Sequence, residues 1–306
     1  MTTRTAHMPG GTIWFGAYAA ACAAVFWEPL HALTQVALTS DTYSHILLIP
    51  FISLFLLWME RERLLKGLEP NHLSAGILLC AGVLAGAFAR RAASISPGGD
   101  WLTLAILGFL CVIWAGFLFF YGSSVFKDAL FPLLFLLLMV PLPGFLLDRF
   151  IEWLQVGSAD VAEVIFRLSG TPVLREGLIF VLPQVSIEVA KECSGIRSTQ
   201  ALLITCLLAG YLLLRTNWRR SALLVAAIPV LIIKNGVRIA TLTLLAVNVD
   251  PSFLTGRLHH EGGFVFFALG MLILLPLLWW FQKSEAAQRG RGGLPATGAA
   301  TGAPRG

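Results

Sequence analysis

Eight long apolar runs, nearly free of charge, constrain this chain more than any other feature of its sequence. A bilayer core about 30 Å thick needs about 20 apolar residues for each helical span. With 57% hydrophobic and only 13% charged residues, the chain has too few polar groups to cover a water-facing surface. We therefore expect an all-α polytopic membrane protein with about eight transmembrane helices. The runs cover residues 12–33, 44–59, 73–93, 101–121, 129–147, 196–214, 221–249 and 264–282.

The first run could instead be a cleaved signal peptide, because it is rich in small residues and follows Arg4. We favour an uncleaved span, since apolar and aromatic residues continue through Trp27 and Leu30. The C-terminal stretch is rich in Gly, Ala and Arg and cannot form a core, so we expect it to be disordered. The expected organisation is a cytoplasmic N-terminus over residues 1–11, a transmembrane domain over 12–282 and a cytoplasmic tail over 283–306.

The distribution of Lys and Arg among the loops predicts the orientation. If the N-terminus is cytoplasmic, the cytoplasmic segments carry twelve Lys and Arg residues, whereas the short outer loops carry only Arg90, Arg91 and Arg257. Cytoplasmic loops are enriched in these residues, so both termini are expected in the cytoplasm. Arg90 and Arg91 fit this rule least well. The formal net charge of +5 is then a sign of topology rather than of a nucleic-acid partner.

One substantial segment outside the membrane is expected, over residues 148–195. Apolar residues at helical spacing alternate with acidic ones over 148–168, which predicts an amphipathic helix or helix pair at the outer surface. After Gly170-Thr171-Pro172, alternating β-branched residues predict a short β-hairpin. This segment leads directly into the sixth apolar run.

Polar residues at membrane depth are costly, so each marks a candidate functional site. Three clusters occur: one around Cys193, a second from Lys234 to Arg238 inside the seventh run, and a third at His259-His260. The expected orientation brings all three to the outer leaflet. A thiol beside cations loses its proton more readily, and an imidazole can carry a proton to a leaving group. A cysteine nucleophile site follows, with the guanidinium stabilising negative charge.

Each of these residues also has a simpler interpretation. The other cysteines lie inside apolar runs, where a thiol behaves as a small hydrophobic group. Arg238 could simply extend its side chain towards the membrane–water interface. Lys234 and Asn235 could form a polar cluster that supports Arg238. His259, His260 and Glu261 could be metal ligands, but adjacent residues lack helical spacing, and no metal site is expected.

At these positions the sequence resembles the exosortase/archaeosortase family of polytopic membrane transpeptidases. The matching motifs are V-A-K-E-C-S-G-I-R-S at 189–198, N-G-V-R-I at 235–239 and H-H-E-G-G-F at 259–264. Two further stretches are similar, D-T-Y-S-H at 41–45 and P-L-P at 141–143. Together these motifs run in order through most of the apolar part of the chain.

The resemblance implies a cysteine transpeptidase or protease that cleaves C-terminal sorting signals of exported proteins through a thioester. A bacterial signal of this kind, PEP-CTERM, has a short Pro-Glu-Pro-like motif, a transmembrane helix and a basic cluster. The implied location is the bacterial inner membrane, with the active site outside and a connection to exopolysaccharide export. No cofactor is implied, and the acceptor is an amine or water.

The resemblance also implies roles for individual residues. Cys193 is the nucleophile, Arg238 stabilises the thiolate or the oxyanion, and His259 is the general acid and base, because Gly263 lies four residues after His259 as in the family pattern. A shift of one residue would make His260 the catalytic histidine. Supporting roles are expected for Ser194, Arg197 and Asn235.

Two alternatives from other functional classes remain open at this point. A transporter of lipid-linked saccharides or small solutes would line its path with Lys234 and Arg238 and would tolerate changes at Cys193. The lack of internal repeats counts against this alternative. A non-catalytic assembly factor for surface polysaccharide export would tolerate separate loss of Cys193, Arg238 and His259.

Overall fold

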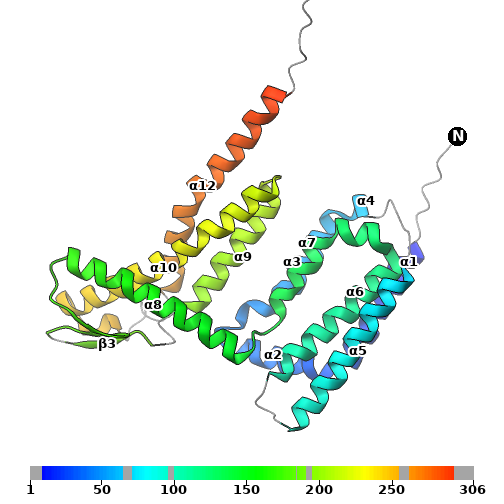
Figure 1. Ribbon diagram of the computed structural model, residues 1–306, viewed down its shortest axis with the longest axis horizontal. Coiled ribbons are helices and arrows are strands. Elements are labelled where there is room, and N and C mark those ends of the chain that lie inside the picture. Colours follow the sequence, from blue (N-terminus) through cyan, green and yellow to red (C-terminus); the bar gives the residue numbers. More distant parts are fainter. Residues whose placement is uncertain are drawn as a thin grey trace, which may run out of the picture. The chain divides into compact units, whose positions relative to one another are not determined.

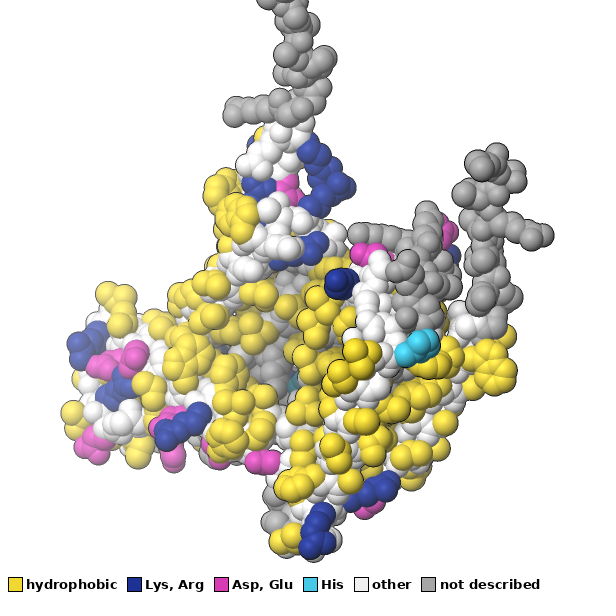
Figure 2. Space-filling view, turned by 45° about the vertical axis from the view of Figure 1, so that its right-hand side comes forward, with side chains coloured by type: hydrophobic (Ala, Val, Ile, Leu, Met, Phe, Trp, Pro, Cys, Tyr) yellow, Lys and Arg dark blue, Asp and Glu magenta, His cyan; other side chains and the backbone are white. Residues whose placement is uncertain are grey.

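The computed structural model describes residues 9–64, 71–95, 100–183, 185–190, 195–254 and 262–292, which are mainly helical (Figure 1). Six helices are long and apolar enough to cross a membrane, and up to eight spans result if each of two bent helix pairs counts as one. The expectation of an all-α polytopic membrane protein is confirmed. Figure 2 shows the corresponding surface, on which hydrophobic side chains predominate.

The chain divides into two compact units, with the boundary between Arg149 and Phe150. The first unit contains helices that pack on one another around α5 and α6, which approach closely. A Cβ added to Gly82 of α5 would lie 2.7 Å from the Gly108 carbonyl oxygen of α6, so only glycine permits this approach. Its elements are α1 (Pro9–Val25), α2 (Trp27–Thr39), η1 (Ser44–Leu47), α3 (Ile49–Met59), α4 (Arg61–Leu64), α5 (His72–Ile95), α6 (Trp101–Asp128), α7 (Leu130–Phe135) and η2 (Leu136–Met139).

The first apolar run is not one straight span. The chain bends by 77° between α1 and α2, on either side of Phe26. At the bend, Arg90 Nη2 of α5 donates a hydrogen bond to the Val25 carbonyl oxygen, 2.8 Å away. A carbonyl at the end of a helix lacks its partner within that helix. Arg90, which fitted the loop-charge rule poorly, therefore has a structural role.

The fifth apolar run also differs from expectation. Instead of a span over 129–147, η2 ends at Met139 and a new helix, α8 (Gly144–Leu168), begins after a 90° bend. Pro141 and Pro143 lie at the bend, where proline cannot donate the hydrogen bond that would continue the helix. The ten residues from Leu130 to Met139 are too few to cross a bilayer alone.

The second unit contains most of α8, a small sheet and three long helices. The sheet is antiparallel with the order β1–β2–β3, so the expected hairpin gains a third strand. Phe180 of β2 is fully buried and packs on Phe166 of α8, with ring centroids 5.3 Å apart. α8 is a single amphipathic helix, not a pair. The remaining elements are β1 (Leu174–Glu176), β2 (Ile179–Val181), β3 (Ser186–Glu188), α9 (Ile196–Leu213), α10 (Asn217–Asn248), η4 (Pro251–Leu254) and α12 (Gly263–Gly292).

The long helices α9, α10 and α12 pack on one another (Figure 1). α10 continues through Lys234 to Gly236, which therefore do not interrupt it. α12 runs to Gly292, past residue 282 where the tail was expected to begin. Glu285 explains this extension, because its carboxylate accepts hydrogen bonds from the backbone N–H groups of Arg215 and Thr216.

Candidate functional site

Buried polar side chains gather inside the second unit, at the junction of α8, α9 and α10. A polar group buried in an apolar environment is costly unless it is hydrogen-bonded. The concentration of such groups here therefore requires an explanation beyond packing. We call this set the polar cluster; its members are Ser158 of α8, Ser198 of α9, and Lys234, Asn235 and Arg238 of α10.

Lys234 lies at the centre of the polar cluster. Its side chain is fully buried, and Nζ donates a hydrogen bond to Ser198 Oγ at 2.5 Å. Its aliphatic part lies beside α12, since a Cβ added to Gly270 would be 3.5 Å from Lys234 Cδ. Lys234 therefore lies where α9, α10 and α12 meet.

Asn235 and Arg238 follow on the same helix. Asn235 Nδ2 donates a hydrogen bond to Ser158 Oγ of α8 at 2.9 Å. The next residue, Gly236, permits this contact between helices, because a Cβ there would lie 2.5 Å from the Val161 Cβ of α8. Arg238 lies one turn beyond Asn235 and is only 8% exposed. α8 and α10 thus enclose the Asn235 side chain, and Arg238 is buried one turn farther along α10.

Gly195 joins the polar cluster to the start of α9. It has a φ of +66°, in the left-handed region that favours glycine. A Cβ on Gly195 would collide with Asn235 Oδ1. Its carbonyl oxygen accepts hydrogen bonds from Ser198 Oγ at 3.0 Å and from the Thr199 N–H at 2.9 Å. Both the backbone shape and the carbonyl of Gly195 are therefore fixed.

Hydrogen bonds also fix the backbone at Val189, shortly before Gly195 in the chain. Gln155 of α8 is buried, and its Nε2 donates a hydrogen bond to the Val189 carbonyl oxygen at 2.5 Å. The Val189 N–H in turn bonds to the Leu178 carbonyl oxygen at 2.9 Å. Residues with hydrogen-bonded backbone groups therefore precede and follow residues 191–194, namely Val189 and Gly195.

The contacts of α9, α10 and α12 fix their relative directions. Ser198 lies opposite Lys234, and Gly210 lies opposite Arg220, so α9 and α10 are antiparallel. Gly270 lies opposite Lys234, and Glu285 contacts Arg219 at 3.4 Å, so α12 is antiparallel to α10 as well.

A common end of the helix bundle follows from these directions. At 1.5 Å per residue, Gly195 lies about 4.5 Å beyond Ser198, Arg238 about 6 Å beyond Lys234, and Gly263 about 10 Å beyond Gly270. The start of α9, the guanidinium-bearing turn of α10 and the start of α12 therefore all lie on the same side of Lys234. The three motifs of the sequence adjoin this end.

A family model described as transmembrane exosortase matches residues 13–276, most of the chain. The chain belongs to the transmembrane exosortase family. No curated protein and no solved structure gave a significant match. The match covers both units of this exosortase and includes the whole polar cluster.

The structure places some of the expected site residues of this exosortase. Arg238 and Asn235 are buried and adjacent on α10, whereas the Arg197 side chain is exposed in the first turn of α9. The other expected residues, Cys193, Ser194, His259 and His260, fall outside the described residues. Their roles therefore remain predictions from the family resemblance.

Sequence reasoning missed Gln155, Ser158 and the role of Ser198 in this exosortase. Serine is common in helices and carries no signal of burial by itself. Its partners here are 36 residues away for Ser198 and 77 for Ser158. Only their place beside polar residues of α10 identifies them, and that requires the fold.

The environment of Lys234 bears on the transporter alternative, in which this residue would line a solute path. In the described part of this exosortase, Lys234 is 0% exposed and engaged with Ser198.

Within the same part, no group of three or more His, Cys, Asp or Glu side chains could hold a metal ion.

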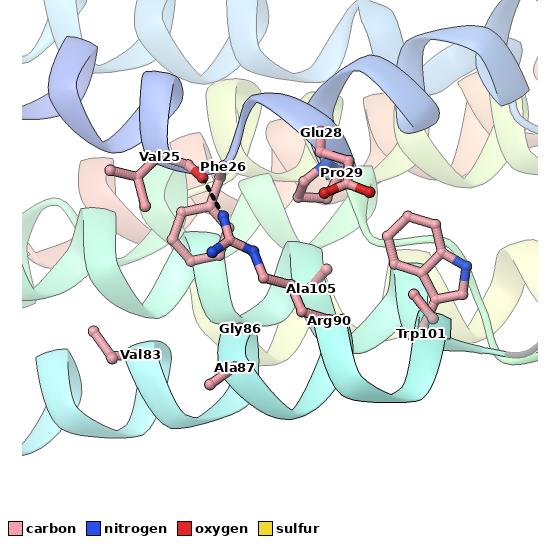
Figure 3. A pocket seen from close by; sticks show the side chains of 11 residues that line it. Val25, Phe26, Glu28, Pro29, Val83, Gly86, Ala87, Arg90, Trp101 and Ala105 are labelled. Carbon is pink, nitrogen blue, oxygen red and sulfur yellow. Dashed lines mark hydrogen bonds between the residues drawn. The ribbon is translucent and has the colours of Figure 1, made fainter. Parts of the chain in front are cut away.

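A pocket of about 300 Å³ lies in the first unit of this exosortase, at the bend between α1 and α2 (Figure 3). Arg90 crosses it to reach the Val25 carbonyl oxygen, and Glu28 and Trp101 lie at its wall. The lining contains no cysteine, serine or histidine. This lining therefore offers a guanidinium and a carboxylate but no hydroxyl, thiol or imidazole group.

Proposed function

We propose that this exosortase is a cysteine transpeptidase or protease that cleaves C-terminal sorting signals of exported proteins. Cys193 is the nucleophile, Arg238 stabilises negative charge, and His259 is the general acid and base, with His260 as the alternative register. The observation that carries the proposal is the contact between Gly195 and the polar face of α10. This contact ties the motif that contains Cys193 to the turn that bears Arg238.

Chain connectivity limits how far Cys193 can be from Arg238. Two virtual bonds of 3.8 Å keep its Cα within about 7.6 Å of the Gly195 Cα. Gly195 abuts Asn235, which lies one turn and about 4.5 Å before Arg238 along α10. A guanidinium nearby favours the reactive thiolate.

The same reasoning applies to His259. It precedes the buried Gly262 by three residues, so its Cα is within about 11 Å of that residue. Gly262 accepts a hydrogen bond from the Phe266 N–H at 3.2 Å and so starts α12 at the common end of the bundle. The short chain connections from Gly195 to Cys193, from Asn235 to Arg238 and from Gly262 to His259 thus favour a site built from Cys193, Arg238 and His259.

The proposed reaction has two steps. The Cys193 thiolate attacks the scissile carbonyl carbon, and Arg238 stabilises the oxyanion. The carbon–nitrogen bond then breaks, a thioester forms, and His259 gives its proton to the leaving amine. In the second step an acceptor amine or water, deprotonated by His259, attacks the thioester carbonyl. The Cys193 thiolate leaves and the cycle can repeat.

We propose that this site faces the outside of the bacterial inner membrane. The connection between α9 and α10 carries Arg215, and the first turn of α10 carries Arg219 and Arg220; arginines of this kind are typical of the cytoplasmic side. The common end of the bundle, with Gly195 and Arg238, is opposite to that connection. The end of α12 is then cytoplasmic, and the Lys and Arg residues of the loops predict the same side for the N-terminus. The segment over 148–195 lies outside as a cover or docking surface for the substrate.

Replacing Cys193 tests the proposal. The assay is cleavage of a co-expressed reporter that ends in a Pro-Glu-Pro motif, a hydrophobic helix and a basic cluster. We expect Cys193→Ala to abolish cleavage without changing the amount of membrane-inserted protein. Cys206→Ala is the matched control, because Cys206 lies on α9 but is buried among apolar residues. Normal cleavage by Cys193→Ala would refute the proposal.

A further inference from the structure

Lys234 is a fully buried lysine that the proposed reaction does not use. Membrane-embedded charges are rare and usually functional. Its partner Ser198 is 7% exposed and has a second hydrogen bond, to the Gly195 carbonyl oxygen. The connection therefore runs from Lys234 through Ser198 to the residue that starts α9.

The hydrogen-bond directions in this connection are consistent. A serine hydroxyl has one proton to donate and two lone pairs to accept. Lys234 Nζ donates to Ser198 Oγ, which donates its own proton to the Gly195 carbonyl oxygen. Hydrogen bonds linked in this way polarise and strengthen one another. Lys234 thereby fixes a backbone carbonyl on another helix.

We propose that Lys234 is a positioning residue that acts through Ser198 to fix Gly195, which lies two residues after Cys193, beside the α10 face that bears Arg238. The inference rests on the proposed function, because it assigns Cys193 as the nucleophile. Lys234 and Arg238 lie four residues apart on one helix and hence on one face. A single rigid element, α10, thus carries the stabilising guanidinium and also sets the backbone that leads to the nucleophile.

Asn235 completes this arrangement from the other side. Its amide group is fixed by the hydrogen bond to Ser158 and lies against the Gly195 Cα. Gly195 is therefore held twice, at its carbonyl by Ser198 and at its Cα by Asn235. Loss of Lys234 would loosen the carbonyl while leaving Asn235 and Arg238 on an intact helix.

A Ser–Lys pair can also act directly as nucleophile and base in some proteases. The geometry here favours positioning, because the Ser198 hydroxyl is buried and donates to the Gly195 carbonyl oxygen. The two roles predict different results in the Cys193→Ala variant. A direct Ser198 nucleophile would leave cleavage intact, whereas the positioning role predicts none.

The test compares Lys234→Met, Ser198→Ala and the double variant in full-length protein reconstituted into lipid nanodiscs. The first measurement is kcat and KM for cleavage of the reporter with the Pro-Glu-Pro motif, hydrophobic helix and basic cluster. We expect each variant to lower kcat by up to about 100-fold with little change in KM, because a small misplacement of a reacting group is that costly. The double variant should be no slower than the slower single variant, since both changes break one connection.

Matched controls separate positioning from general damage. Thr205→Ala removes a similar hydroxyl bond on α9, from Thr205 Oγ1 to the Ala201 carbonyl oxygen. Lys127→Met removes an exposed lysine at the end of α6. Both controls should keep kcat within about twofold of the wild type. Gel filtration and thermal unfolding show whether each variant is folded.

A second readout does not depend on cleavage. In a chain that keeps only Cys193, a membrane-impermeant maleimide reports the reactivity of this thiol. Lys234→Met should change the labelling rate at least severalfold, and Lys127→Met should leave it unchanged. Wild-type kcat in both Lys234→Met and Ser198→Ala would overturn the inference, as would a double variant whose losses multiply. Cleavage by Cys193→Ala would instead refute the proposed function itself.

Discussion

Gly195→Ala tests the geometry of the site with a single methyl group. The substitution forces an L-residue into a left-handed backbone conformation, at a cost of about 1–2 kcal/mol. The new Cβ also collides with Asn235 Oδ1, and overpacking of this kind costs about 1–3 kcal/mol. We therefore expect a loss of about 2–5 kcal/mol in local stability at the start of α9, and a large loss of reporter cleavage.

Gly177→Ala is the matched control for the backbone effect. Gly177 has the same φ of +66°, in the turn between β1 and β2, but no atom lies within 4 Å of an added Cβ. It should therefore show only the conformational cost. The difference between the two variants isolates the collision with Asn235, which should amount to about 1–3 kcal/mol.

The assay combines thermal unfolding in detergent with reporter cleavage in membranes. Gly195→Ala should lower cleavage at least tenfold, and Gly177→Ala should leave cleavage near the wild-type rate. Adding Asn235→Ala to Gly195→Ala removes the colliding oxygen and should recover part of the lost stability. The reasoning is refuted if Gly195→Ala and Gly177→Ala behave alike in both measurements.

Two further predictions concern contacts away from the proposed site. Glu285→Ala leaves Arg219, which is 2% exposed, without its carboxylate partner. Thermal unfolding should therefore show a loss of stability of about 3 kcal/mol. The prediction is contradicted if Glu285→Ala is as stable as the control Glu28→Ala, which changes an exposed glutamate. Arg90→Met removes the hydrogen bond to the Val25 carbonyl oxygen at the bend of the first unit and should lower the free energy of unfolding by about 1 kcal/mol. The control Arg91→Met, one residue away, should lower it less. Equal effects of the two substitutions would show that the hydrogen bond has no stabilising role.

Apolar run length was sufficient to predict most of the helices that are long enough to cross a membrane. The helices α5, α6, α9, α10 and α12 match runs in the sequence, and each is long enough to cross a bilayer. The bends at Phe26 and between Met139 and Gly144 were not predicted. Hydropathy cannot show where a helix breaks, because the broken hydrogen bonds are satisfied by distant groups such as Arg90.

The proposed site was partly predictable for a related reason. A charged or amide side chain inside an apolar run is conspicuous, so Lys234, Asn235 and Arg238 were identified from sequence. The serines that bind them were not, since their role depends on helix contacts. The role of Gly236 depends on the same kind of contact, because this glycine allows α10 to pack closely on α8.

Trapping the acyl intermediate tests the central claim most directly. The wild-type protein is incubated with the reporter, quenched in acid, and analysed by mass spectrometry with and without neutral hydroxylamine, which cleaves thioesters. The account predicts a hydroxylamine-labile adduct of the reporter on Cys193 that is absent from Cys193→Ala. An adduct on Ser198, or continued cleavage by Cys193→Ala, would contradict it.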